Sequence, residues 1–457
     1  MRILKSINPA NEKEIMSYKV DSREEIGLIL SDSKDAQAIW ASSKISLRCS
    51  CLEQLSGILK DRSREYAQIM AEEMGKPFSQ GLAEVEKCSL LCDYYKDNSE
   101  KFLMDQSVKT NYYKSIVSIE PIGLVLGVMP WNFPFWQVFR FALPVITAGN
   151  GAILKHASNV QGCANVIEES FLEAGYPNNI FRNLTIPGSD VNEIIENDSI
   201  AAVTFTGSTT VGKSVAAKSG HELKKTVLEL GGSDPYIILD DANLDYAVSS
   251  CISGRLLNAG QSCIAAKRII VTRKNIINFS KCLENELNKK IVGDPMDEVD
   301  MGPMVSIYAR NIIHNQVHRS IDSGAVLKMG GSIPDGIGAY YPITLLTEVK
   351  PGMAAFDEEL FGPVFVLITA LNNNHAINLA NQTEFGLGAA IFTSDIEKGE
   401  NIARNNIKSG VCFVNDFVQS DPRLPFGGVK KSGYGRELSL HGMMEFVNMK
   451  TIVVNKL

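Results

Sequence analysis

The stretch AAVTFTGSTTVG, residues 201–212, leads from a strand pattern directly into a helix start. The residues of AAVTFT are apolar or β-branched, which is typical of a buried strand. Gly207 and Ser208 follow, and we expect a helix to begin near Thr209. A strand that turns at once into a helix is half of a βαβ unit, so this stretch predicts a parallel sheet covered by helices.

The same alternation extends over most of the chain. On either side of this stretch, short apolar runs are separated by helix-length segments: IGLVLGV, GAILK, IFRNLTI and TVLEL. After Glu229 a second alternating region begins, with the strand candidates PYIIL, AAKRIIVT, VFVLITAL, GLGAAIFT and SGVCFVN. The first hundred residues read instead as helices, at 22–43 and 47–76. We therefore predict an α/β fold with two parallel-sheet domains.

Composition narrows the class of partner. At 457 residues, with 45% hydrophobic and 21% charged residues, the chain is long enough for two or more domains with large cores. A net charge of −7 without a long Lys/Arg run argues against nucleic acid. No run reaches the ~18 apolar residues of a membrane span, and the start lacks a signal-peptide pattern. Nine cysteines without a repeated CxxC pair indicate reduced thiols and a cytoplasmic protein without zinc clusters.

The strand-to-helix turn also suggests a ligand site. A helix start presents unpaired N–H groups and a positive dipole end, which suit a dinucleotide pyrophosphate. Gly207 and Gly212 would allow close approach, and Ser208 lies at the turn itself. The turn lacks the GxGxxG fingerprint, so an ordinary helix start remains the alternative.

Five segments taken together identify a family. They are PWNFP (130–134), VLELGG (227–232), GQSC (260–263), EELFGPV (358–364) and PFGGVKKSGYGRE (425–437). In this order and at these separations they resemble the aldehyde dehydrogenase superfamily, from about Asn8 to the C-terminal MKTIVVNKL. Within this superfamily, the segments LKHAS, LELGGSDP and FGGVKKSG are most similar to the short bacterial succinate-semialdehyde dehydrogenases.

The resemblance implies a domain arrangement and an assembly. It implies a Rossmann-like cofactor-binding domain from 1–104, 120–229 and 416–439, and a catalytic domain from 230–415. Residues 105–119 and 440–457 would form a small β oligomerisation arm. Exposed strand edges of this kind pair across subunits, so we expect a homodimer or homotetramer.

The resemblance also assigns the chemistry. Cys263 would attack the aldehyde to give a thiohemiacetal, and hydride loss to a nicotinamide would leave a thioester. Glu229 matches the glutamate that activates the hydrolytic water, while Asn132 and the backbone N–H of Cys263 match the oxyanion hole. The alternatives are a surface carboxylate at a helix end for Glu229 and a turn-shaping role for Asn132.

NADP or NAD is the expected cofactor. By resemblance, the residues that bind it are Lys155, Ser158, Gly207, Ser208, Gly212, Trp131, Glu359 and Phe361. Many NAD-specific relatives carry a carboxylate where this chain has Ser158, so an NADP phosphate would meet no like-charge repulsion there. The alternative is that Ser158 only caps the following helix.

A substrate with a distal carboxylate needs a cation or several donors opposite the thiol. Arg140, eight residues after Asn132, is the first candidate, and Arg423 is the second. Trp136 and Phe426 would supply apolar walls. Animal-type relatives carry another arginine at the position of Leu257, so tail recognition here must differ.

Other patterns carry less weight. His314 and His318 have the spacing of a zinc pair, but a third ligand is not evident and we expect no metal. Cys88 and Cys92 read as core contacts, and His156 has no expected catalytic role. The sequence therefore predicts an NAD(P)-dependent oxidoreductase that makes succinate from its semialdehyde. The alternatives are a dehydrogenase for another aliphatic or aromatic aldehyde, a CoA-acylating relative, or a non-catalytic structural protein.

Overall fold

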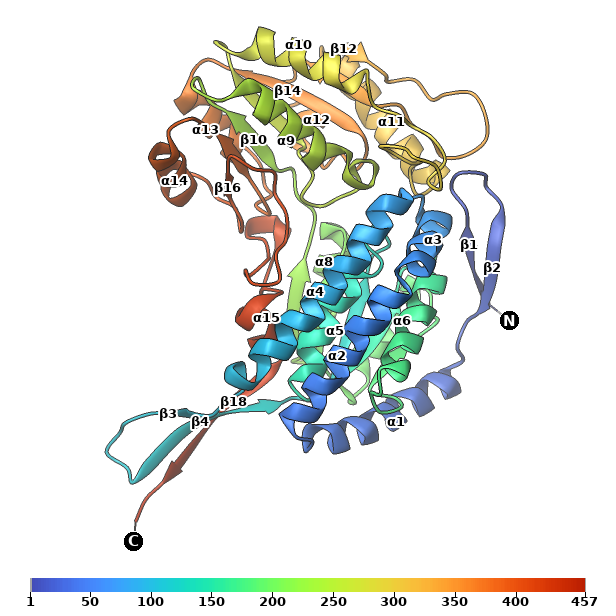
Figure 1. The fold of residues 1–457 in the computed structure, drawn as a ribbon, viewed down its shortest axis with the longest axis vertical. Helices are drawn as coiled ribbons and strands as arrows, with labels where there is room; N and C mark the ends of the chain where they lie inside the picture. Colours follow the sequence, from blue (N-terminus) through green and yellow to red (C-terminus); the bar gives the residue numbers. More distant parts are fainter. Residues whose placement is uncertain (1, 457) are drawn as a thin grey trace.

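The computed structural model describes residues 2–456, and its first sheet is the one that the opening stretch predicted (Figure 1). This six-stranded sheet has the order β17-β9-β8-β5-β6-β7, with all neighbours parallel except β17 and β9. Its strands are β5 (Leu124–Met129), β6 (Gly151–His156), β7 (Phe181–Asn183), β8 (Ile200–Thr206), β9 (Lys225–Glu229) and β17 (Gly433–Tyr434). Every residue of β5 and β6 is buried, as expected for parallel strands that helices cover on both faces.

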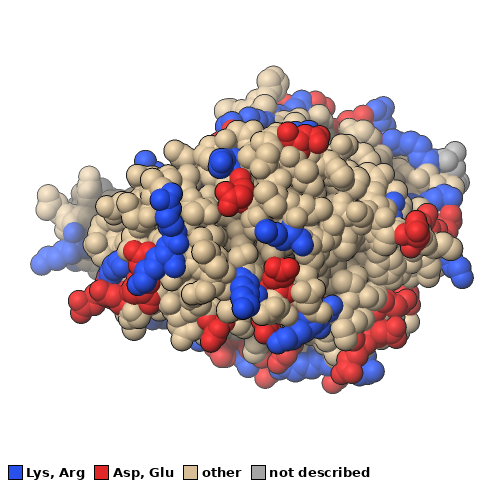
Figure 2. Space-filling view, turned by 90° about the horizontal axis from the view of Figure 1, so that it is seen from above, with Lys and Arg blue, Asp and Glu red and all other residues tan. Residues whose placement is uncertain are grey.

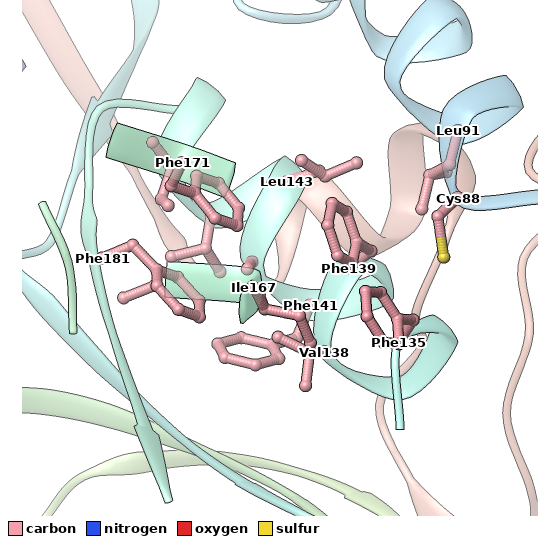
Figure 3. Packing of buried hydrophobic residues seen from close by; sticks show 14 of the residues in the cluster. Cys88, Leu91, Phe135, Val138, Phe139, Phe141, Leu143, Ile167, Phe171 and Phe181 are labelled. Atoms are coloured by element: carbon pink, nitrogen blue, oxygen red, sulfur yellow. The ribbon is translucent and has the colours of Figure 1, made fainter. Parts of the chain in front are cut away.

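Helices cover this first sheet. They are α1 (Arg23–Ala41), α2 (Ile45–Asp61), α3 (Ser63–Met74), α4 (Phe78–Phe102), α5 (Trp136–Thr147), α6 (Gln161–Glu173), α7 (Val191–Glu196), α8 (Thr209–His221) and α15 (Ser439–Met444). Helix α5 is buried along its whole length. Figure 3 shows Phe139 and Phe141 of this helix, and Phe135 just before it, in the same cluster as Phe171 and Cys88, which confirms Cys88 as a core residue. The predicted helix 47–76 is divided into α2 and α3 at Arg62, whose backbone angles (φ −99°, ψ 13°) depart from those of an α-helix.

The second alternating region forms a seven-stranded sheet of order β12-β13-β14-β11-β10-β15-β16. Its strands are β10 (Pro235–Ile238), β11 (Arg268–Thr272), β12 (Val326–Met329), β13 (Thr344–Thr347), β14 (Val364–Ala370), β15 (Ala390–Phe392) and β16 (Phe413–Val414). Its helices are α9 (Leu244–Leu256), α10 (Ile276–Leu287), α11 (Ile307–Asp322), α12 (Ala354–Asp357), α13 (Asn373–Asn381) and α14 (Ile396–Asn405). The five strands predicted here are all present, and β12 and β13 add an edge that the sequence did not indicate.

Two smaller β elements complete the fold. Strands β3 (Gln106–Ser107), β4 (Lys114–Pro121) and β18 (Val447–Val454) form an antiparallel ribbon that extends away from the rest of the chain (Figure 1). A hairpin of β1 (Ile3–Ile7) and β2 (Glu14–Lys19) precedes the first helix. The prediction that the first hundred residues are helical was therefore wrong for residues 3–19. In β1 the fully buried residue is the polar Ser6, whereas Ile3 and Ile7 are exposed, and β2 is exposed over most of its length, so apolar residues do not mark an inner face.

Charge is dispersed over the surface. In Figure 2, Lys and Arg side chains alternate with Asp and Glu over the visible face, without a broad area of one sign. Among residues 2–456, no helix is long and apolar enough to cross a membrane.

The strand order fixes where a ligand site can form. From β5 the chain adds β6 and β7 on one side, and then returns to add β8 and β9 on the other. At such a reversal, the loops that leave neighbouring strands diverge and open a crevice at their carboxyl ends. The loop after β5 carries Asn132, and the turn after β8 carries Gly207 and Ser208.

Candidate active site

Cys263 follows a turn that few residues can form. After α9, Asn258, Ala259 and Gly260 all have left-handed backbone angles, with φ of 54°, 54° and 72°. This conformation costs a non-glycine residue about 1–2 kcal/mol. At Gly260 a Cβ atom would lie 2.3 Å from the Gly362 carbonyl oxygen, so glycine is required for close approach. The small residues of NAGQSC are therefore explained by a tight turn that directs Cys263 inward.

Hydrogen bonds fasten this turn to the loop after β5. The Asn258 side chain donates to the Asn132 carbonyl oxygen (2.7 Å), and the Asn132 side chain donates to the Gln261 carbonyl oxygen (3.0 Å). The Gln261 side-chain oxygen accepts from the Val305 amide (2.9 Å). Asn132 thus bonds across to the other domain, which is more than the local turn shaping considered as its alternative.

The Cys263 side chain lines a cavity of about 490 Å³ that both domains form. Elements α4 and α5 contribute from one side, and α9 and the segment 417–420 from the other. Burial raises the pKa of the Cys263 thiol to about 12, and the nearby cations Lys267 and Arg140 oppose this rise. The thiol is therefore protonated at neutral pH, and any reaction as a nucleophile requires a base to remove its proton.

Glu229 ends strand β9 and is 2% exposed, so the alternative of a surface carboxylate at a helix end was wrong. Neither of its carboxyl oxygens forms a hydrogen bond within residues 2–456. Burial raises the pKa of Glu229 well above its usual range, Glu437 raises it further, and Arg140 opposes both effects. A buried, unpartnered carboxyl group with a raised pKa is suited to proton transfer.

Glu437 forms a buried ion pair with Arg140, a partnership that the sequence did not indicate. Arg140 is 2% exposed, donates to the Gln137 side-chain oxygen (2.6 Å) and lies 4.9 Å from the centre of the Phe426 ring. It lines the cavity, as do Trp136 and Phe426. The charge of Arg140 is therefore compensated by Glu437.

Arg423 does not join this group. It is exposed and forms an ion pair with Asp421 (2.6 Å), and it is absent from the residues that line the cavity. The structure instead brings Lys87 and Ser420 to the cavity. Lys87 lies in the middle of an amphipathic helix, where a lysine usually indicates a solvated face, so no motif singled it out.

Glu359 is held beside the thiol loop. Its carboxylate accepts from the Lys267 ammonium (3.0 Å) and from the Gly232 amide (3.1 Å). Lys267 also donates to the Cys263 carbonyl oxygen (2.6 Å), so one buried ammonium group links Glu359 to the backbone of Cys263. A Cβ atom at Gly231 would lie 2.2 Å from the Glu359 carboxylate, and one at Gly232 would lie 3.0 Å from the Leu387 side chain and 3.1 Å from the Cys263 carbonyl oxygen, so both glycines of VLELGG permit close approach. The rings of Phe361 and Trp131 meet edge to face, 5.9 Å apart.

The turn after β8 has the predicted form. Helix α8 begins at Thr209, and the Ser208 hydroxyl caps it by accepting from the Val211 amide (3.4 Å). A Cβ atom at Gly212 would lie 2.4 Å from the Leu230 side chain, so this glycine permits close packing between the helix and the strand end. At the end of β6, Lys155 is 7% exposed and has no ion pair or side-chain hydrogen bond within residues 2–456. Burial lowers the pKa of Lys155 to about 8.

His156 and Ser158 follow on the same segment. The His156 ring accepts from the Ala157 amide (2.9 Å), so its other nitrogen donates to the Pro134 carbonyl oxygen (3.0 Å). Burial lowers the pKa of His156 to about 4, and the neutral ring links the end of β6 to the loop of Asn132. Helix α6 begins at Gln161 after Val160, and no side chain caps it. The alternative that Ser158 serves as the helix cap was therefore wrong.

The histidine pair of α11 lies elsewhere. His314 and His318 stack edge to face on that helix, and His314 contacts the Tyr341 hydroxyl (3.3 Å). Among residues 2–456, no three His, Cys, Asp or Glu side chains are grouped as metal ligands would be. Cys92 is fully buried in the core, as predicted.

A cavity that holds a thiol between two parallel-sheet domains defines an α/β enzyme class with its site at the domain junction. A model of the aldehyde dehydrogenase family matches residues 2–452, and the chain belongs to this family. The predicted fold class is confirmed, since solved structures of the family superimpose over the full chain with TM-scores of 0.95–0.97.

Three relatives illustrate the likeness. A probable succinate-semialdehyde dehydrogenase [NADP(+)] of Synechocystis sp. is 43% identical over 98% of both chains. The succinate semialdehyde dehydrogenase [NAD(P)+] Sad of Escherichia coli strain K12 is 42% identical over 98% of this chain and 97% of its own. The crystal structure of the Streptococcus pyogenes succinic semialdehyde dehydrogenase with NADP+ has a TM-score of 0.97 at 35% identity, covering 99% of this chain and 100% of its own.

Proposed function

We propose that this protein oxidises succinate semialdehyde to succinate with NADP or NAD as cofactor. The observation that carries the proposal is the cavity itself, which has the Cys263 thiol in its wall together with the cationic side chains of Lys87 and Arg140. An aldehyde group would lie at the thiol while a carboxylate on the same molecule lies near the cations. The named functions of the relatives agree with this substrate.

The residues present fit a nicotinamide dinucleotide. The first-turn amides of α8, with Gly207 and Ser208, suit the pyrophosphate, and the unpartnered ammonium of Lys155 suits the adenosine ribose. Glu359 would bind the nicotinamide ribose, with Phe361 and Trp131 beside it. Ser158 adds no negative charge near Lys155, which favours acceptance of the NADP phosphate. The bound cofactor supplies the hydride acceptor.

Cys263 begins the reaction by attacking the aldehyde carbon once its proton has been removed. The Asn132 side chain and the Cys263 backbone N–H stabilise the oxyanion of the thiohemiacetal. Loss of hydride leaves a thioester on the sulfur. Glu229, after losing its own proton, activates a water that releases succinate and regenerates the thiol. The balance is one aldehyde, one water and one oxidised cofactor consumed, with one acid, one reduced cofactor and one proton produced.

The walls of the cavity set specificity. Trp136 and Phe426 supply apolar surface for the methylene chain. Arg140 contributes hydrogen-bond donors while Glu437 compensates its charge. Since Arg423 is exposed and paired with Asp421, we assign it no contact with the substrate.

We further propose a homodimer or homotetramer assembled through the ribbon of β3, β4 and β18. In support, β18 lies at the edge of that ribbon and leaves Met449, Val453 and Val454 exposed. Light scattering of the purified chain, with and without residues 447–456, tests this assembly. A monomer at micromolar concentration would contradict this part of the proposal.

A substrate panel tests the activity. Succinate semialdehyde should give the highest kcat/KM among succinate semialdehyde, butanal, hexanal and benzaldehyde, with each cofactor. Equal or higher kcat/KM for an uncharged aldehyde would support the alternative of a general aliphatic or aromatic aldehyde dehydrogenase.

A further inference from the structure

Three basic side chains line the Cys263 cavity, and they differ in how their charge is compensated. Arg140 is paired with the buried Glu437, and Lys290 is paired with Asp300 at 2.8 Å. Lys87 has no acidic partner within 4 Å in the part of the chain from 2 to 456. The cavity therefore presents one cation whose charge is uncompensated.

The acids closest to Lys87 are engaged by other groups. Glu84, one turn earlier on α4, pairs with the buried Lys76 and accepts from the Phe135 and Trp136 amides (both 2.9 Å). Asp421 is paired with Arg423 at 2.6 Å. Both carboxylates are already engaged, so neither competes with an anion from solution for Lys87.

Ser420 completes a receptor beside Lys87. Its hydroxyl oxygen accepts from the Lys87 ammonium (2.9 Å) and from the Trp136 indole N–H (3.1 Å). With both acceptor positions taken by these donors, the hydroxyl hydrogen remains available to donate. No acceptor for it occurs within residues 2–456, although Ser420 is only 8% exposed. The Lys87 ammonium also lies 4.4 Å from the centre of the Trp136 ring, which fixes its position.

We propose that Lys87 and Ser420 bind the distal carboxylate of the substrate, with Lys87 supplying the charge and Ser420 a neutral donor. This inference rests on the proposed function and adds the residues that set its specificity. It accounts for tail recognition in a chain that has Leu257 in the same cavity, where animal-type relatives carry an arginine.

The environment of Lys87 agrees with a cation held ready for an anion. Burial lowers the pKa of Lys87 to about 8, Arg140 lowers it as well, and Glu84, Asp421 and Cys88 oppose the shift. The ammonium is therefore still mostly charged at neutral pH but loses its proton above pH 8. A bound carboxylate would stabilise the charged form.

The experiment compares Lys87→Met, Lys87→Arg and Ser420→Ala with the parent on succinate semialdehyde and butanal. Loss of a hydrogen bond to a charged group corresponds to about a 10- to 100-fold change. We expect Lys87→Met to raise KM for succinate semialdehyde by about this factor, and Ser420→Ala by about 3- to 10-fold. Lys87→Arg keeps the charge and should restore most of the preference. The matched control is Lys290→Met, which removes a paired cation from the same cavity and should change the preference less than 2-fold.

A pH series gives a second readout. For the parent, KM for succinate semialdehyde should rise as the pH increases through 8, because the neutral amine no longer attracts a carboxylate. Lys87→Arg should abolish this rise, and KM for butanal should not show it. This measurement remains informative if Lys87→Met proves poorly folded.

The outcomes separate the inference from the proposed function. If the parent does not prefer succinate semialdehyde over butanal, the proposed function fails and the inference fails with it. If the parent has the preference and Lys87→Met retains it, only the inference fails. An equal loss on both substrates would assign Lys87 a structural role and would also overturn the inference.

Discussion

Replacing Glu229 with glutamine separates the two halves of the proposed reaction. Both carboxyl oxygens of Glu229 lack hydrogen bonds within the described residues, so the change breaks no contact seen in the structure. Glutamine has the same shape but cannot act as a base. We therefore expect hydrolysis of the thioester to slow while the fold is retained.

The magnitude follows from the role of a single general base. Such a group contributes about 10²- to 10⁴-fold to the rate, or about 2.7–5.4 kcal/mol of barrier. Steady-state kcat should fall by this factor. The free energy of unfolding should also differ at high pH. Because the pKa of Glu229 is raised in the native state, the native protein holds a proton that the unfolded chain has lost, and the parent therefore loses stability as the pH rises. The Glu229→Gln variant has no such proton and should not show this loss.

Rapid mixing of Glu229→Gln with substrate and cofactor is the decisive assay. We expect a burst of reduced cofactor approaching one equivalent per site, followed by slow turnover, and an acyl adduct on Cys263 by mass spectrometry. A slower burst would mean that Glu229 also takes the thiol proton. Unchanged steady-state turnover, or an adduct on another residue, would refute the reasoning.

Three further predictions concern the charges around the thiol. Glu437→Gln removes a group that raises the pKa of Glu229, and it also leaves the charge of Arg140 uncompensated, which lowers that pKa further. The acidic limb of the profile of kcat against pH should therefore move to lower pH, and a move to higher pH would contradict this. Ser158→Glu should raise KM for NADP by roughly 10- to 100-fold and change KM for NAD much less, because a carboxylate repels the 2′-phosphate; initial rates with both cofactors check it. Lys267→Met removes a cation that lowers the pKa of Cys263, so iodoacetamide alkylation should require a higher pH, as a pH series of labelling rates would show.

The sequence predicted those parts of the fold whose pattern is local. Strand β8 and the start of α8 could be read from twelve residues, since the strand, the glycine and the N-cap serine are adjacent in the chain. The hairpin of β1 and β2 could not, because the residue of β1 that is fully buried is the polar Ser6, while Ile3 and Ile7 are exposed and β2 is exposed over most of its length.

Contacts between side chains that are far apart in the sequence could not be predicted. Motifs singled out Cys263, Glu229 and Asn132, but not the contacts that set their protonation. The pairing of Arg140 with Glu437 joins positions 297 residues apart, and Ser420 meets Lys87 from 333 residues away. Arg423 was named as a candidate for substrate binding because it lies beside a matched motif, but its position in the sequence does not reveal the direction of its side chain, which is exposed and paired with Asp421.

The charges of the site can be considered as one set. Burial favours the neutral forms of the Cys263 thiol and of Glu229 by raising the pKa of both groups, while Arg140 is balanced by Glu437 and Lys267 by Glu359. Isolated charges are costly to bury, so a resting site in which most groups are neutral or paired costs the fold little.

Among the cations that line the cavity in the described part of the chain, Lys87 is the exception to this balance. A substrate carboxylate would bring the single negative charge that compensates it, whereas an uncharged aldehyde would leave the ammonium unpaired. Selectivity would then arise from the uncompensated charge of Lys87 in the unliganded protein as well as from contacts in the complex. On this reasoning, succinate semialdehyde should raise the melting temperature of a Cys263→Ala variant more than butanal does, and Lys87→Met should remove the difference.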